Sequence, residues 1–252
     1  MATRGLRARW HRDEPVHACW ITMPEPMGAE ILARQGWPGL VIDLQHGAID
    51  DPAALRVLQT IHGLGTLPLV RVAWLDPGAV MKALDRGAQG VICPMIDNVE
   101  QAEAFVQNCL YPPLGLRSWG PVRAGMDGSA QYAARANDLV APIVQIETLG
   151  ALEQLDAILA VPGLAAIFVG PNDLAWALGH GPGSDREEPE LLELLLELPA
   201  RARALGVQAG IHCGSPAYAQ RMVEAGYRLI TIGSDASFMG RAGRAMLGSL
   251  GR

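Results

Sequence analysis

The stretches PIVQIE (142–147) and AIFVGPND (166–173) each carry a short apolar run into an acidic residue, Glu147 and Asp173. Runs of this length that are apolar throughout are typical of parallel β-strands buried on both faces. Because parallel strands end at the same edge of a sheet, we expect the two carboxylates to lie together there. Such a pair suits a hard divalent cation such as Mg²⁺ or Mn²⁺. Taken singly, Glu147 could instead cap a helix and Asp173 could begin the next one.

These two runs belong to a series of eight strand-like runs that helical patterns mostly separate. The eight runs cover 17–23, 39–44, 67–72, 90–95, 141–147, 165–170, 207–211 and 228–232. Eight apolar strands that alternate with helices predict an α/β fold, a (β/α)₈ TIM barrel, in one domain over residues 1–252. An open dinucleotide-binding sheet is disfavoured because no Gly-x-Gly-x-x-Gly follows the first strand.

Helix start and stop signals support this alternation. Capping side chains stand directly before a proline, which suits the first helical turn, at Asp51-Pro52, Asp76-Pro77 and Ser215-Pro216. Glycines follow at the positions where the same three helices should end, namely Gly63, Gly87 and Gly226.

Two segments depart from the alternation. Residues 111–138 are too long and too rich in glycine and proline for a tight loop, which is typical of a lid or an interface segment. Residues 188–198 predict a leucine-rich helix whose broad apolar face fits the core or a subunit contact.

Composition excludes several classes of partner. The net charge of −6 comes without a basic cluster, which argues against nucleic acid. No apolar stretch reaches the roughly 18 residues that span a bilayer, so no membrane partner is expected. The four cysteines lack paired spacing, and we expect a soluble, cytoplasmic protein. Lys82 is the single lysine and falls inside a predicted helix, which disfavours Schiff-base chemistry.

In barrels of this kind, the active site lies at the C-terminal ends of the strands. The residues that the sequence places there are Asp43, His46, Arg71, Gln145, Glu147, Gly170, Pro171, Asn172 and Asp173. Singly, His46 could be a structural histidine, Arg71 could pair with a neighbouring carboxylate, and Asp43 could hold a loop. We interpret the set as one site because a base, a cation and two acids converge on one rim.

The combination of motifs resembles the HpcH/HpaI aldolases, the metal-dependent class II pyruvate aldolases such as 4-hydroxy-2-oxoheptanedioate and 2-dehydro-3-deoxyglucarate aldolases. The motifs are D-x-x-H after the second strand, V-R-V, Y-P-P-x-G-x-R-S-x-G, Q-x-E and G-P-x-D-L, and the resemblance covers about 28–244. It implies a (β/α)₈ barrel in a homo-hexamer, a trimer of dimers with the last helix exchanged between subunits.

The resemblance also implies the roles of the site residues. Glu147 and Asp173 would hold Mg²⁺, Mn²⁺ or Co²⁺, and Arg71 would donate to the oxygen that becomes an enolate. Asp43 would orient His46 as the acid/base. Backbone N–H groups at 170–173, together with Gln145, would bind pyruvate or a close 2-oxo acid such as hydroxypyruvate. The reaction would be the reversible cleavage of a 4-hydroxy-2-oxo acid to pyruvate and an aldehyde.

Some positions depart from the family pattern and leave alternatives open. Gln45 stands where some relatives carry an acid. His212 and Cys213 follow the seventh strand at a position that is often apolar in the aldolases, so they could change the aldehyde pocket. Arg123, in the long loop, is a hypothetical contact for the aldehyde's tail. A malyl- or citryl-thioester lyase and a barrel that binds 2-oxo acids without turnover are the alternative functions.

Overall fold

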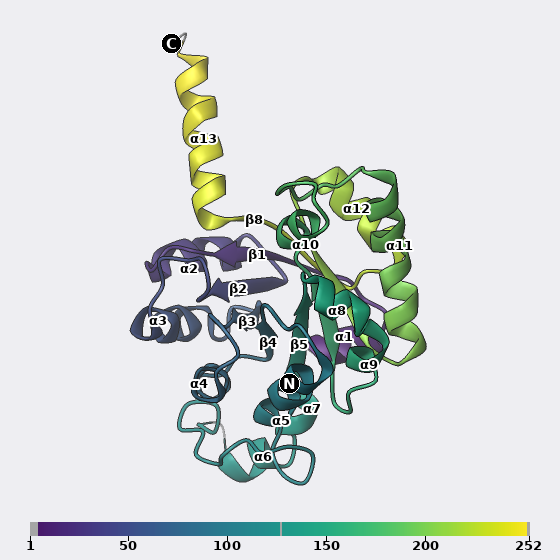
Figure 1. Cartoon of the computed structure of the whole chain (residues 1–252). Helices are drawn as coiled ribbons and strands as arrows, with labels where there is room; N and C mark the ends of the chain where they lie inside the picture. The colour runs from purple at the N-terminus through teal and green to yellow at the C-terminus, as the bar shows by residue number, and fades with distance from the viewer. Residues whose placement is uncertain (1–4, 127, 251–252) are drawn as a thin grey trace.

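The chain folds into a closed barrel of eight parallel strands surrounded by helices, as Figure 1 shows. The computed structural model describes residues 5–126 and 128–250. The strands are β1 (Val16–Ile21), β2 (Gly39–Asp43), β3 (Leu67–Arg71), β4 (Gly90–Cys93), β5 (Ala141–Ile146), β6 (Ala166–Val169), β7 (Gln208–Cys213) and β8 (Leu229–Ser234). Each strand pairs with the next, and β8 pairs with β1 to close the barrel.

The helices between and around the strands differ in length. They are α1 (Leu6–His11), α2 (Pro26–Arg34), α3 (Asp51–Ile61), α4 (Pro77–Asp85), α5 (Val99–Cys109), α6 (Ser129–Ala133), α7 (Ala136–Leu139), α8 (Leu149–Glu153), α9 (Leu155–Leu159), α10 (Pro171–Ala177), α11 (Pro189–Ala204), α12 (Pro216–Ala225) and α13 (Asp235–Ser249). Within the described residues, no helix is both long and apolar enough to cross a membrane.

The apolar side chains form two cores because each strand is buried on both faces. The larger core fills the space between the outer face of the barrel and the surrounding helices. The smaller core fills the barrel interior, and α1 adds Leu6 and Trp10 to it. The Trp10 indole N–H donates to the Arg228 carbonyl oxygen at 2.9 Å, which holds α1 to the segment before β8. Since β1 and β8 both start next to this contact, α1 lies at the N-terminal end of the barrel.

The predicted strands are confirmed, each within two residues at either end. Asp76 and Ser215 cap α4 and α12 as predicted, through the backbone N–H groups of Ala79 and Tyr218. The prediction for α3 was wrong by one residue. Asp50 is the cap and accepts from the Ala53 N–H, because the helix already includes Asp51.

The two irregular segments also take definite forms. Residues 111–138 contain the short helix α6 and all but the last residue of α7. The leucine-rich helix runs on past the predicted end at 198 to Ala204, with Pro199 inside it. The last helix, α13, projects away from the barrel, as Figure 1 shows.

Candidate active site

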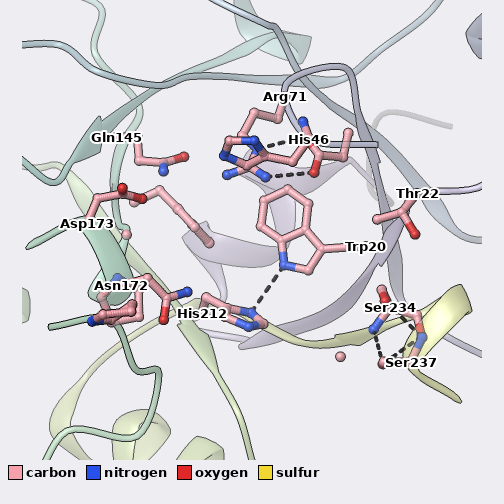
Figure 2. A pocket seen from close by; sticks show the side chains of 16 residues that line it. Trp20, Thr22, His46, Arg71, Gln145, Asn172, Asp173, His212, Ser234 and Ser237 are labelled. Carbon is pink, nitrogen blue, oxygen red and sulfur yellow. Dashed lines mark hydrogen bonds and ion pairs between the residues drawn. The ribbon is translucent and has the colours of Figure 1, made fainter. Parts of the chain in front are cut away.

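A cavity of about 630 Å³ opens at the C-terminal ends of the strands. Figure 2 shows the side chains that converge on it. Eight of the nine residues predicted for the site line it: Asp43, His46, Arg71, Gln145, Gly170, Pro171, Asn172 and Asp173. The ninth, Glu147, is almost fully buried directly beneath this lining, against Gln145 and Gly170.

Arg71 is held in the cavity wall by two neighbours. The pairing of β2 with β3 sets Asp43 opposite Arg71, and the two side chains form a bidentate ion pair. Arg71 Nε lies 2.9 Å from Asp43 Oδ1, and Nη2 lies 2.7 Å from Oδ2. The Arg71 guanidinium also lies over the Trp20 ring, 4.3 Å from its centre. A planar guanidinium fixed in this way presents its remaining N–H groups in one orientation.

Asp43 reaches His46 through the backbone. Its Oδ1 accepts hydrogen bonds from the backbone N–H groups of Gln45 and His46, at 3.0 and 3.3 Å. The carboxylate therefore shapes the turn that carries His46, whose exposed imidazole lines the cavity. Both single-residue alternatives raised by the sequence therefore occur here, since Arg71 pairs with a neighbouring carboxylate and Asp43 holds the turn.

Glu147 is a carboxylate buried at the cavity floor, with 2% of its surface exposed. Its Oε1 accepts from the Met95 backbone N–H at 2.8 Å, and its Oε2 accepts from the Gln145 side-chain amide. Burial raises the pKa of Glu147, the two hydrogen bonds lower it, and the negative charge of Asp173 raises it further. The positive charge of Arg71 also lowers this pKa, and the net shift is upward.

Asp173 stands in the first turn of α10, beside Glu147. Gly170 precedes this helix, and any Cβ there would collide with the Glu147 carboxylate and the Gln145 amide. The Gly170 N–H donates to the Ile146 carbonyl at 3.2 Å, and Pro171 has no N–H. Four residues, 170–173, were expected to bind a carboxylate through their backbone. Of these, only Asn172 and Asp173 have N–H groups in the first turn of α10 that remain for a ligand.

The donor set at this rim fits a hard divalent cation. Glu147 and Asp173 offer carboxylate oxygens, and the Gln145 Oε1 atom is buried without a hydrogen-bond partner. All three are oxygen donors, which Mg²⁺ and Mn²⁺ prefer. No cluster of three or more His, Cys, Asp or Glu side chains that could hold a metal occurs in the described part of the chain. Water and substrate oxygens would have to complete the coordination.

Several residues of the cavity were not predicted from the sequence. Trp20, Thr22, Phe168, Pro182, Gly233, Ser234 and Ser237 also line it. Met95 holds Glu147 through its backbone, at a positive φ of 55° that side chains rarely adopt and that recurs at functional sites. His212, left open by the sequence, lines the cavity too.

Other residues singled out by the sequence lie elsewhere. Arg123 donates to the Arg86 and Leu58 carbonyl oxygens near the ends of α4 and α3, outside the cavity lining. Arg117 is buried and pairs with Asp85 at 2.7 Å. Lys82 lies 3.6 Å from Asp51 on the outer helices, with its side chain mostly exposed.

Comparison with known proteins gives consistent matches. The family model described as HpcH/HpaI aldolase/citrate lyase matches residues 17–242. A hydroxypyruvate/pyruvate aldolase of Rhizorhabdus wittichii is 37% identical over 242 residues, which is 96% of each chain. A 4-hydroxy-2-oxo-heptane-1,7-dioate aldolase of Klebsiella pneumoniae is 33% identical and covers 92% of this chain and 88% of its own. The crystal structure of an HpcH/HpaI aldolase/citrate lyase family protein from Burkholderia cenocepacia superposes with a TM-score of 0.87 at 34% identity, over 95% of this chain and 96% of that one.

Proposed function

This chain belongs to the HpcH/HpaI aldolase/citrate lyase family and is a carbon–carbon lyase, and we propose that it is a divalent-metal-dependent class II aldolase. The proposed reaction is the reversible cleavage of a 4-hydroxy-2-oxo acid to an aldehyde and pyruvate, or a close 2-oxo acid such as hydroxypyruvate. The names of the R. wittichii and K. pneumoniae relatives support this substrate class.

The observation that carries the proposal is the pair of carboxylates, Glu147 at the cavity floor and Asp173 in its lining, in a cavity that Arg71 also lines. These two side chains, with Gln145 Oε1 nearby, would hold Mg²⁺, Mn²⁺ or Co²⁺. When bound, such an ion acts as a Lewis acid toward the 2-oxo group and makes the adjacent C–H bonds more acidic.

The chain's own groups would then divide the remaining work. Arg71 would donate to the 2-oxo oxygen as negative charge develops there, and its fixed orientation means that little reorganisation is needed. His46 would move the proton between the carbon next to the carbonyl and the aldehyde oxygen, directly or through one water. The N–H groups of Asn172 and Asp173 would bind the substrate carboxylate at the start of α10.

The proposal extends to the assembly. We propose a homo-hexamer, a trimer of dimers in which α13 packs on a neighbouring subunit. The support is the projection of α13 from the barrel in Figure 1 and the burial of a single side chain within it, Asp235. A helix so exposed, with several large apolar side chains, gains stability by packing against a second chain.

The test of the activity is pyruvate enolisation, followed by NMR as the loss of methyl protons in D₂O. Exchange is expected with Mn²⁺ or Mg²⁺, not with EDTA, and it should be abolished in Glu147→Gln. The matched control is Glu153→Gln, which removes an exposed carboxylate on α8 and should leave exchange intact. Absence of exchange with every metal would refute the aldolase proposal and favour the thioester lyase or the non-catalytic barrel.

A further inference from the structure

His212, near the end of β7, lies where the main cavity meets a smaller hollow of about 330 Å³ over the start of α13. In Figure 2 its ring lies below Trp20, away from Arg71, Gln145 and His46. Those three side chains are assigned to the 2-oxo acid and its proton transfer, and the N–H groups of Asn172 and Asp173 to its carboxylate. The smaller hollow on the other side of His212 is lined by none of these groups, so this side of the cavity remains for the aldehyde.

The His212 ring is held in one tautomer by its neighbours. The Trp20 indole N–H, which can only donate, points to His212 Nδ1 at 3.1 Å. The pairing of β7 with β8 sets His212 opposite Thr231, whose Oγ1 lies 3.0 Å from the same nitrogen. Nδ1 must therefore carry a lone pair, and the ring proton sits on Nε2.

The ring also stays neutral in this setting. Burial lowers the pKa of His212, and the positive charge of Arg71 acts in the same direction. The Thr231 backbone and Asp185 act in the opposite direction, and the net shift is downward. A neutral imidazole with Nδ1 as acceptor has one N–H to offer, at Nε2.

That N–H is open to the cavity. The hydrogen bonds that the ring makes with the Trp20 and Thr231 side chains both reach Nδ1, not Nε2. Nε2 is not one of the fully buried, unpartnered polar atoms of the described residues, so part of its surface is accessible. Since the side chain lines both hollows, a ligand oxygen can meet this donor there.

We propose that His212 is a specificity-determining residue whose Nε2–H donates to a hydroxyl oxygen of the aldehyde, so that hydroxylated aldehydes are preferred over deoxy analogues. This inference rests on the proposed aldolase function, because it concerns the second substrate of that reaction. A donor placed in a largely enclosed site penalises an analogue that lacks the acceptor, since the donor then stays unpaired.

The kinetic test compares glycolaldehyde with propanal, in which a methyl group replaces the hydroxyl, as acceptors for pyruvate. His212→Leu should lower the ratio of the two kcat/KM values about three- to tenfold, as expected for one neutral hydrogen bond. His212→Gln, which places an amide N–H near the Nε2 position, should recover part of the ratio. His17→Leu is the matched control, because His17 is a partly buried β1 residue outside the cavity lining, and it should keep the wild-type ratio. An unchanged ratio in a folded His212→Leu protein overturns the inference.

A second readout does not depend on turnover. With ¹⁵N-labelled histidine, NMR should show His212 as the neutral Nε2–H tautomer, its signal identified by its loss in His212→Leu. Trp20→Phe keeps a ring beside Arg71 but removes the indole N–H, and it should release the fixed tautomer. A wild-type His212 with its proton on Nδ1, or on both nitrogens at neutral pH, overturns the inference. Lack of pyruvate exchange would instead refute the proposed function, and the tautomer would still be measurable.

Discussion

Arg71 is a charged residue of the cavity whose orientation is fixed by its neighbours. Asp43 binds it through two parallel hydrogen bonds and Trp20 covers one face, so its position is fixed before any ligand arrives. Lysine would keep the charge but lose both the planar fork and the stacking. The role proposed for Arg71 therefore depends on its geometry as much as on its charge.

Replacing Arg71 by lysine is accordingly expected to lower kcat/KM for aldol cleavage on the order of a hundredfold, as loss of an oriented oxyanion donor does. Steady-state kinetics with a 4-hydroxy-2-oxo acid would measure the loss. Arg86→Lys is the matched control, because Arg86 pairs with Asp51 among the outer helices. A loss of similar size in both variants would assign the effect to folding instead of to the site.

The ionisation of Glu147 should make the free energy of unfolding depend on pH. Burial raises the pKa of its carboxyl above the ordinary value of 4.5, so the folded protein holds this proton more tightly than the unfolded chain. Stability of the metal-free protein should therefore fall as the pH rises from about 4.5 through the raised pKa. Glu147→Gln removes this ionisation, and the Gln145 amide can rotate to accept from the new side chain.

The difference in unfolding free energy, Glu147→Gln minus wild type, should thus become more positive from pH 4.5 to pH 8 in EDTA. Urea denaturation at a series of pH values measures it. A difference that stays constant with pH would show that Glu147 titrates normally in the folded protein.

The charged residues of the candidate site could be proposed from the sequence because each stands at the end of an apolar run or shortly after it. It could not reveal the contact between Trp20 and His212, which come from β1 and β7 and meet only when the barrel closes through β8. It offered a neighbouring carboxylate as a partner for Arg71, but only the strand register shows that this partner is Asp43. The Met95 contact depends on an unusual backbone angle, which no residue type signals.

The strands were predictable because an apolar run bounded by turn residues fits few structures other than a buried strand. Helix starts were predictable where a capping side chain precedes proline, and the one-residue error at α3 arose because Asp50 and Asp51 can both cap. The short helix α1 was not foreseen, since its six residues carry only two buried side chains, Leu6 and Trp10.

The caps lend themselves to a direct test. The Asp76 carboxylate accepts from the Ala79 N–H at 2.6 Å at the start of α4. Asp76→Ala should lower the free energy of unfolding by about 1 kcal/mol, while activity persists because α4 lies outside the cavity lining. Asp76→Asn, which keeps the accepting oxygen, should lose less. Equal losses for both variants in urea denaturation would argue against the cap.

For the whole molecule, the unexplained feature is α13. Met239, Met246 and Leu250 are spaced seven and four residues apart, so they share one face of the helix, and each is more than 60% exposed. Gly243 lies on the same face, where its lack of a side chain permits close approach of another helix or barrel. An apolar stripe of this kind supports the proposed packing of α13 on a neighbouring subunit. The stripe could be recognised only from the fold, which shows that the barrel does not cover it.

The double variant Met239→Glu/Met246→Glu places two charges on this stripe and should break the proposed hexamer into smaller species, because burying unpaired carboxylates at an interface is costly. Native mass spectrometry or light scattering would follow the change from six times the mass of one chain. Leu205→Glu, at the exposed end of α11, is the matched control and should leave the assembly intact. A wild-type chain that is monomeric at micromolar concentration would refute the proposed exchange of α13. A hexamer that survives both glutamates would place the subunit contacts on another surface.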